Sequence, residues 1–158
     1  MISLTHTHIL RQLVLSLVLL FSTFAAAQPL SIGINAMWIP GDESSLRARF
    51  QKAKALGVSQ VRLDWEWRQV EAVKGQYDWQ KLDTLVRVAY EEQIELFPIV
   101  HYAPAWALRP ESKPDEIYQM APAESAFADY ARFLKASIER YGPNGNYPQA
   151  FTPIVYWH

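Results

Sequence analysis

The sequence lacks cysteine altogether, and neither sign of charge dominates it. Its 15 lysine and arginine residues are matched by 16 aspartate and glutamate residues, for a net charge of −1. Without cysteine the chain cannot form a disulfide bond or a thiolate metal site, so its stability must come from a packed core. Nothing in this balanced charge suggests the basic face that nucleic-acid binding requires. We therefore expect no nucleic-acid partner.

Long apolar runs are absent as well. The longest spans residues 13–24, and these 12 residues are too few to cross a bilayer as a helix. The alanines at 25–27 follow this run and are typical of a signal-peptidase site. The pattern predicts a signal peptide over 1–27, cleavage after Ala27, and a secreted or periplasmic protein without stable membrane association. An uncleaved membrane anchor is the alternative interpretation of the same run.

The remainder, residues 28–158, has the length of one domain, because removal of 27 from 158 residues leaves 131. Apolar segments alternate in it with segments of helical periodicity. The predicted strands are 30–38, 58–65, 94–101 and 151–157, and the predicted helices are 44–56, 79–92 and 124–141. This alternation predicts parallel strands that are joined by crossover helices.

Two α/β architectures fit this order. The first is a (β/α)8 TIM barrel, of which the chain would supply about three and a half βα units, since a complete barrel takes about 250 residues. The second is an open doubly wound sheet, but no turn carries the glycine-rich phosphate loop of that fold. The longest irregular connection, 102–122, leaves the end of the third predicted strand. In a barrel this is the face that carries the active site.

The connection after the second strand has structural signals of its own. Gly75 predicts a turn, and Asp78 is a good N-cap for the helix that follows. We expect Glu71 and Asp78 to cap and brace this turn. Trp67 and Trp79 are expected to pack beneath it as part of the core.

Six short motifs occur in an order and spacing that resemble those of clan-A glycoside hydrolases. The motifs are Val61-Arg62-Leu63-Asp64, Trp67-Arg68-Gln69-Val70-Glu71, Gly75-Gln76-Tyr77-Asp78-Trp79, Leu96-Phe97-Pro98-Ile99-Val100, Tyr102-Ala103-Pro104-Ala105-Trp106 and Glu139-Arg140-Tyr141-Gly142. The resemblance covers nearly all of 30–158. The clan consists of retaining (β/α)8 barrels with cellulase-like, xylosidase-like and β-galactosidase-like members. The resemblance therefore implies a TIM-barrel glycosidase and a carbohydrate substrate.

The sequence departs from the clan pattern at two places. Gln93 stands before the third strand, where clan members usually have glycine or asparagine because the helix ends there with positive φ. Keeping that geometry costs ~1 kcal/mol. The sequence also reaches the Tyr156-Trp157 pair of the fourth strand, but not the asparagine-glutamate-proline motif that follows this pair in the clan.

The second departure bears on catalysis. Retaining hydrolysis uses two carboxylates about 5 Å apart, one as nucleophile and one as acid/base. The resemblance places both glutamates beyond His158, so we expect no catalytic residue in this chain, and no metal or cofactor. We interpret the sequence as the N-terminal half of a glycosidase, inactive and poorly folded alone. The alternatives are a non-catalytic carbohydrate-binding or scaffold protein and a different exported TIM-barrel hydrolase.

The second predicted strand supplies the strongest candidate for a supporting role. Arg62, Asp64 and Glu66 alternate, so a regular strand points all three to one side. The resemblance implies that Arg62 reaches the nucleophile and holds it ionised, since an opposite charge within ~4–6 Å lowers a carboxylate pKa. An ion pair that locks strands together is the alternative. Asp64 either bonds a sugar hydroxyl or pairs with a neighbouring base.

The other candidate sugar contacts lie within or near the ends of predicted strands. They are Asn35, Trp38, Trp65, His101 and Trp106. An indole stacks on the apolar face of a pyranose, but a tryptophan at such a place also plugs loops. His101 either touches the sugar or is a core histidine with its hydrogen bonds satisfied.

Overall fold

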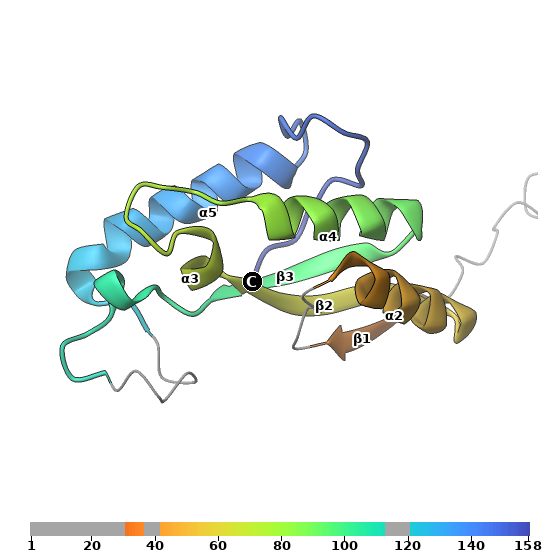
Figure 1. Cartoon of the computed structure of the whole chain (residues 1–158), viewed down its shortest axis with the longest axis horizontal. Helices are drawn as coiled ribbons and strands as arrows, with labels where there is room; N and C mark the ends of the chain where they lie inside the picture. Colours follow the sequence, from red (N-terminus) through yellow and green to blue (C-terminus); the bar gives the residue numbers. More distant parts are fainter. Residues whose placement is uncertain (1–30, 37–41, 113–120) are drawn as a thin grey trace, which may run out of the picture. The chain divides into compact units, whose positions relative to one another are not determined.

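The computed structural model describes residues 31–36, 42–112 and 121–158, and Figure 1 shows their arrangement. The predicted signal peptide and Trp38 lie outside these residues, so both stay predictions. Within the described residues, no helix has the length and apolar character needed to cross a membrane.

Strands and helices alternate along the described chain. The elements are β1 (Ile32–Ala36), α2 (Glu43–Ala55), β2 (Val58–Glu66), α3 (Trp67–Val70), α4 (Gln80–Glu91), β3 (Glu95–His101), the short 3-10 helices η2 (Ala105–Ala107) and η4 (Glu124–Ala126), and α5 (Phe127–Tyr141). The strands form a parallel sheet in the order β1-β2-β3. The predicted parallel strands with crossover helices are therefore confirmed for these elements, with bounds that differ by a few residues.

The prediction of a strand over 151–157 is wrong, because the structure has no strand there. Only His158 pairs with the sheet. Its N–H donates to the carbonyl of Pro98 at 3.1 Å, and its carbonyl accepts from the N–H of Val100 at 2.7 Å, as in a parallel ladder. Pro98 has no N–H to donate in the preceding rung, toward Tyr156, and this missing donor weakens the ladder where the strand was expected.

The sheet has one face covered by helices. Val61, Leu63 and Trp65 of β2 point to this face and are at most 2% exposed. Trp65 packs edge-on against Tyr141 of α5 with ring centroids 5.3 Å apart, and its Nε1 donates to Ser137 Oγ at 3.2 Å. Because side chains alternate along a strand, the residues between these three point to the opposite face.

The core continues beneath the β2–α4 connection. Phe133 of α5 stacks against Trp67 on one side and Trp79 on the other, with ring centroids 5.9 and 6.2 Å apart. Trp67 is fully buried, and Trp79 is half-buried against the core. The predicted packing role of both tryptophans is confirmed. Arg140 of α5 also pairs with Asp83 of α4 at 2.7 Å, which fixes the two helices to each other.

Hydrogen bonds brace the β2–α4 connection as predicted. The buried Glu71 side chain accepts from Trp67 Nε1 at 2.6 Å and from the Gly75 N–H at 2.7 Å. Asp78 accepts from the N–H of Gln80, the first residue of α4, at 3.0 Å. The N-cap residue of α4 is Trp79, however, so the prediction of Asp78 as the N-cap is wrong by one residue. The turn is therefore held by carboxylates at both of its ends.

Gln93 ends the turn after α4 with φ of 59°, as the clan resemblance implied. A Cβ in this left-handed conformation is strained, whereas glycine adopts it freely. We expect Gln93→Gly to raise the free energy of unfolding by about 1 kcal/mol, measured by urea denaturation. Gln93→Ala keeps the Cβ and should give no gain. A Gly variant no more stable than the Ala variant would contradict this explanation.

Candidate functional site

The face of the sheet opposite the helices is polar along β2. We call the set Asn35, Gln60, Arg62, Asp64, Glu66 and His101 the polar sheet face. The register places Asn35 opposite Arg62 and His101 opposite Glu66, so residues of three strands meet there. Asp64, Glu66 and His101 stand at the C-terminal ends of parallel strands. In α/β sheets this is the end where ligands bind.

Arg62 lies in the middle of the polar sheet face and is exposed. Its Nη1 donates to Asn35 Oδ1 on β1, at the long distance of 3.3 Å. A guanidinium carries five N–H donors in a planar fork, so this single bond leaves the group able to bind a carboxylate. The arrangement brings two predicted site residues together.

Asp64 and His101 form the closest pair on this face. His101 Nε2 lies 3.0 Å from Asp64 Oδ1, and Asp64 is 8% exposed. The contact is close but badly aligned, and Nε2 makes no hydrogen bond of good geometry. The pair therefore lies close together without a well-aligned hydrogen bond, and Nε2 of His101 is buried.

Burial raises the pKa of the Asp64 carboxyl. The His101 imidazole and the Arg62 guanidinium oppose this rise, and the negative Glu66 adds to it. A carboxyl whose folded pKa exceeds its unfolded value binds more protons in the folded state. It therefore lowers stability as the pH rises through the window between the two values.

This direction gives a prediction. We expect Asp64→Asn to be more stable than the wild type at pH 7, with the difference vanishing as the pH falls below the unfolded pKa of aspartate. Asp42 is a control of opposite sign, because hydrogen bonds from Ser44 and Ser45 lower its pKa to about 2. Asp42→Asn should be less stable than the wild type at pH 7, and this difference in stability should also disappear at acidic pH. Urea denaturation across the pH range measures both, and an Asp64→Asn variant less stable at every pH would contradict the prediction.

A stack of side chains extends the site beyond His101. The His101 and Tyr102 rings lie 3.6 Å apart between centroids and are tilted by 26°. The guanidinium of Arg68 lies over the Tyr102 ring, 5.2 Å from the ring centroid. The Arg68 Nε also pairs with Glu66 at 2.7 Å. Asp64, His101, Tyr102, Arg68 and Glu66 thus form a chain of contacts at the ends of β2 and β3.

Trp65 does not belong to the polar sheet face, which corrects its assignment as a sugar contact. It points to the helix-covered face, is 0% exposed, and packs between Tyr141 and Trp157. No ligand can reach it without opening the core. Trp106 is half-buried, meets Trp67 edge-on at 5.2 Å and donates to the Glu71 carbonyl at 3.0 Å. These contacts match the loop-plugging alternative, while a sugar contact by Trp106 stays a prediction.

Sequence reasoning missed Arg68 and Tyr102 as members of the site. The backbone N–H of Arg68 donates to the Tyr102 carbonyl at 2.9 Å, so the segments after β2 and β3 are joined directly. Tyr102 has φ of 53°, a left-handed conformation that is uncommon for a residue with a side chain. The available signal was position alone, since both residues follow the ends of neighbouring strands.

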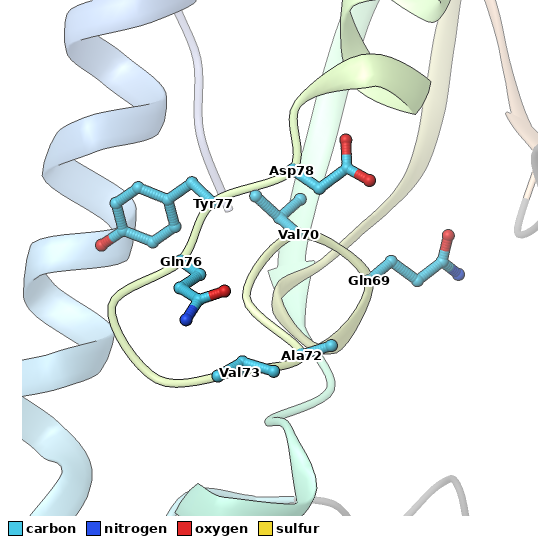
Figure 2. A pocket seen from close by; sticks show the side chains of 7 residues that line it. All are labelled: Gln69, Val70, Ala72, Val73, Gln76, Tyr77 and Asp78. Carbon is cyan, nitrogen blue, oxygen red and sulfur yellow. The ribbon is translucent and has the colours of Figure 1, made fainter.

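One pocket lies outside the polar sheet face. It has a volume of about 280 Å³ and is lined by Gln69, Val70, Ala72, Val73, Gln76, Tyr77 and Asp78. Figure 2 shows that Gln69 and Val70 come from α3 and the other five from the connection between α3 and α4. None of them is a predicted sugar-binding residue. The Tyr77 ring contacts Trp79 and Phe133, so this connection is anchored on the core.

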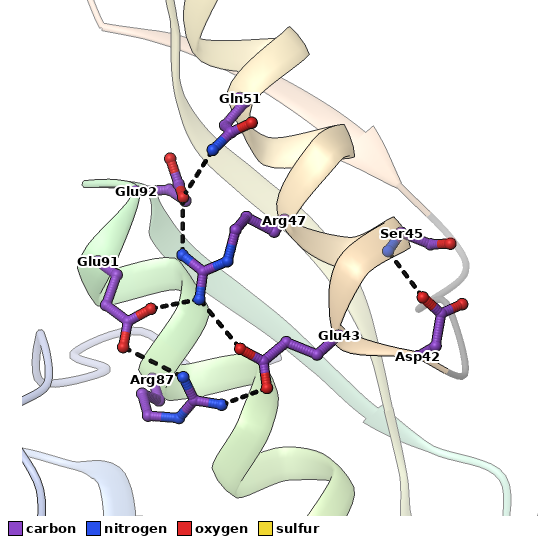
Figure 3. A network of polar contacts seen from close by, with 8 residues as sticks. All are labelled: Asp42, Glu43, Ser45, Arg47, Gln51, Arg87, Glu91 and Glu92. Atoms are coloured by element: carbon purple, nitrogen blue, oxygen red, sulfur yellow. Dashed lines mark hydrogen bonds and ion pairs between the residues drawn. The ribbon is translucent and has the colours of Figure 1, made fainter.

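A second polar cluster, shown in Figure 3, joins α2 to α4. Arg47 pairs with Glu43 and Glu92 at 3.0 and 2.9 Å and also with Glu91, while Arg87 pairs with Glu43 at 2.6 Å. The two arginines are thus shared among three carboxylates, Glu43, Glu91 and Glu92. The cluster therefore holds the two helices together. Among the described residues, no group of three or more His, Asp or Glu side chains is placed to hold a metal ion.

Comparison with solved structures identifies the fold. A family 39 glycoside hydrolase from the gut symbiont Bacteroides cellulosilyticus WH2 aligns over 82% of this chain with a TM-score of 0.57 and 23% identity. A β-galactosidase from the psychrophilic Marinomonas ef1 aligns over 81%, with a TM-score of 0.60 and 17% identity. A GH5_18 protein from Bifidobacterium longum subsp. longum ATCC 55813 aligns over 70%, with a TM-score of 0.53 and 13% identity.

The described chain therefore has a mixed α/β fold with three parallel strands that matches TIM-barrel glycoside hydrolases. The chain covers 24%, 21% and 30% of the lengths of these three structures, in the same order. No protein-family model matches the sequence, and no curated protein matches it significantly.

Proposed function

We propose that the chain forms the first βα units of a secreted (β/α)8 glycoside hydrolase. Its substrate is a poly- or oligosaccharide, and its reaction is cleavage of an O-glycosidic bond with retention of configuration. The observation that carries the proposal is the polar sheet face, which places an arginine in the middle of β2 and two carboxylates and an imidazole at the ends of β2 and β3. The likeness to glycoside hydrolase structures supports the same assignment.

Arg62 is the positioning residue of this proposal. Two carboxylates carry the retaining reaction, and the nucleophile must be ionised when it attacks the anomeric carbon. The exposed Arg62 guanidinium has one long bond to Asn35 and retains donors for a carboxylate on a facing strand. Its positive charge would lower the pKa of that nucleophile.

Asp64, His101 and Asn35 form the sugar-binding part of the proposed site. Carboxylates accept hydrogen bonds from hydroxyls, while an imidazole and a carboxamide both donate and accept them. Asp64 and His101 lie side by side at the ends of β2 and β3, with Nε2 of His101 3.0 Å from Asp64 Oδ1. We assign the two catalytic glutamates to strands that pair with this sheet in the complete barrel, and none of them to the chain described here.

The gene sequence that follows the codon of His158 gives the first test, because an in-frame asparagine-glutamate-proline motif would support the clan assignment. The complete protein is then assayed with aryl β-glucoside, β-galactoside and β-xyloside, and the anomer of the first product is followed by proton NMR. We expect hydrolysis of at least one glycoside with retention. An inverted product would overturn the retaining mechanism. Binding without turnover would support the carbohydrate-binding alternative, and neither binding nor turnover would overturn the proposed function.

A further inference from the structure

The pocket between α3 and α4 is held open by hydrogen bonds within its own segment. The Asp78 N–H donates to the Val70 carbonyl at 2.8 Å, and the Gln76 N–H donates to the Val73 carbonyl at 3.0 Å. These two bonds tie the outgoing side of the connection to the returning side. The pocket therefore exists before a ligand arrives, and binding does not bear the cost of ordering the loop.

The same segment is fixed to the core of the protein. The Tyr77 ring lies 5.2 Å from the Trp79 ring and 6.4 Å from the Phe133 ring of α5, between centroids. Val70 lines the pocket and is 2% exposed, so its backbone is anchored as well. All seven lining residues lie within 69–78. The pocket is thus complete in this segment, unlike the polar sheet face.

The lining combines an apolar wall with a few polar groups. Valine, alanine and tyrosine side chains form the wall, and the polar groups are two carboxamides and one carboxylate. In Figure 2 the exposed Gln76 carboxamide lies within the loop of the connection. The Gln69 oxygen accepts from Lys81 Nζ at 2.5 Å, which fixes the second carboxamide. Carboxamides donate and accept hydrogen bonds and carboxylates accept them, which suits hydroxyl groups beside a C–H surface.

Other classes of ligand fit this lining less well. Asp78 is the one charged side chain among the seven described residues that line the pocket, so an anion would meet a like charge. A metal ion lacks ligands, because no group of three His, Asp or Glu side chains occurs in the part of the chain that the structure describes. The volume of about 280 Å³ lies below the range of about 300–1,000 Å³ of sites for drug-sized ligands. A single neutral sugar ring matches this size and chemistry.

The place of the pocket suggests where that sugar comes from. The helix α3 follows directly after Glu66, the last residue of β2, so the pocket stands on the connection that leaves the C-terminal end of this strand. Ligands of α/β sheets bind at this end. A chain of sugars that is bound at the strand ends can therefore continue over the connection.

We propose that this pocket binds one sugar residue of a neutral polysaccharide away from the bond that is cleaved, so that the enzyme prefers polymers to small glycosides. The inference rests on the proposed function, because the occupant is taken to be part of the hydrolase substrate. The Gln76 carboxamide bonds the sugar hydroxyls, and the apolar wall contacts the C–H face of the ring. The binding energy of this residue adds to that of the residues at the strand ends.

Two substitutions test the pocket in the complete protein. Ala72→Trp fills it with an indole, and Ala72 is exposed, so the larger side chain does not enter the core. Gln76→Ala removes the carboxamide and keeps the backbone bond to Val73. Gln51→Ala is the matched control, since it removes a carboxamide that bonds Glu92 on the side of α2 and α4. Thermal unfolding of each variant reports whether the fold is retained.

The first readout is the ratio of kcat/KM for a polymer to kcat/KM for an aryl glycoside of the same sugar. The polymers are hydroxyethyl cellulose, β-1,4-galactan and arabinoxylan, matched to the aryl glucoside, galactoside and xyloside. We expect the ratio to fall roughly tenfold in Gln76→Ala, which is the loss of about one hydrogen bond, and further in Ala72→Trp. Gln51→Ala should keep the wild-type ratio. A ratio that is unchanged in Ala72→Trp would overturn the proposal, as would an equal fall in Gln51→Ala.

The second readout is the retardation of each protein in gels that contain the same polymers, and it does not depend on turnover. Weaker retardation of Gln76→Ala and Ala72→Trp than of the wild type supports the pocket even if no glycoside is hydrolysed, in which case the proposed hydrolase activity fails and the binding site stands. If aryl glycosides are hydrolysed but both variants are retarded like the wild type, the pocket fails and the proposed function stands. A wild type that is neither retarded nor active would overturn both.

Discussion

Replacement of Arg62 by glutamine is expected to lower kcat/KM of the complete glycosidase by roughly 10²–10³-fold. The substitution should also move the acidic limb of its pH profile upward by about 1–3 units. The exposed guanidinium lies at the centre of the polar sheet face, with one 3.3 Å bond to Asn35. Beside a carboxylate nucleophile it favours the ionised form, so its removal raises the nucleophile pKa. At low pH more of the enzyme is then protonated and inactive, which is why the limb shifts toward higher pH.

Two variants show whether charge or packing is responsible. Arg62→Lys keeps the positive charge but not the planar fork, so it should recover most of the pH shift and only part of the rate. Lys135→Gln removes a cation from an exposed pair with Glu139 on α5 and should leave both quantities unchanged. A loss of rate in Arg62→Gln without any movement of the acidic limb would assign Arg62 the strand-locking role instead.

The polar sheet face could be predicted because strand parity is a local property. Arg62, Asp64 and Glu66 alternate in the sequence, and β2 is regular over that stretch, so the three share a face. The same rule places Trp65 on the opposite face. Trp65 was assigned to the sugar site because it lies near the end of a strand, although its parity places it on the opposite face. The structure shows that parity decides on which face Trp65 lies.

Contacts between separate segments could not be predicted in this way. The bond from Arg68 to Tyr102 joins residues 34 positions apart, and nothing in either residue type indicates a left-handed tyrosine. The failed strand at 151–157 has a similar origin. Its apolar pattern suits a strand, but a ladder depends on donors in the neighbouring strand, and Pro98 of β3 supplies none at its position.

Glu71 was predicted to brace its turn, and the structure gives the reason for a large effect of its removal. The side chain is 2% exposed, and its two oxygens accept from Trp67 Nε1 at 2.6 Å and from the Gly75 N–H at 2.7 Å. Hydrogen bonds to an ionised acceptor are stronger than neutral ones, and a buried donor left without a partner bears its full desolvation cost. We expect Glu71→Ala to lower the free energy of unfolding by about 3–5 kcal/mol, measured by urea denaturation.

Glu71→Gln distinguishes the lost charge from the lost shape. The amide keeps one oxygen to accept from Trp67 or Gly75 but presents its NH₂ group to the other donor, so we expect a loss of about 2 kcal/mol, between those of the wild type and Glu71→Ala. Glu139→Ala removes a carboxylate from an exposed pair and should change stability by less than about 0.5 kcal/mol. Because the Glu71 carbonyl also accepts from Trp106 at 3.0 Å, unfolding of this turn would loosen the segment that follows β3. If Glu71→Ala matched Glu139→Ala in stability, water would have to replace the carboxylate, and the turn would not depend on this residue.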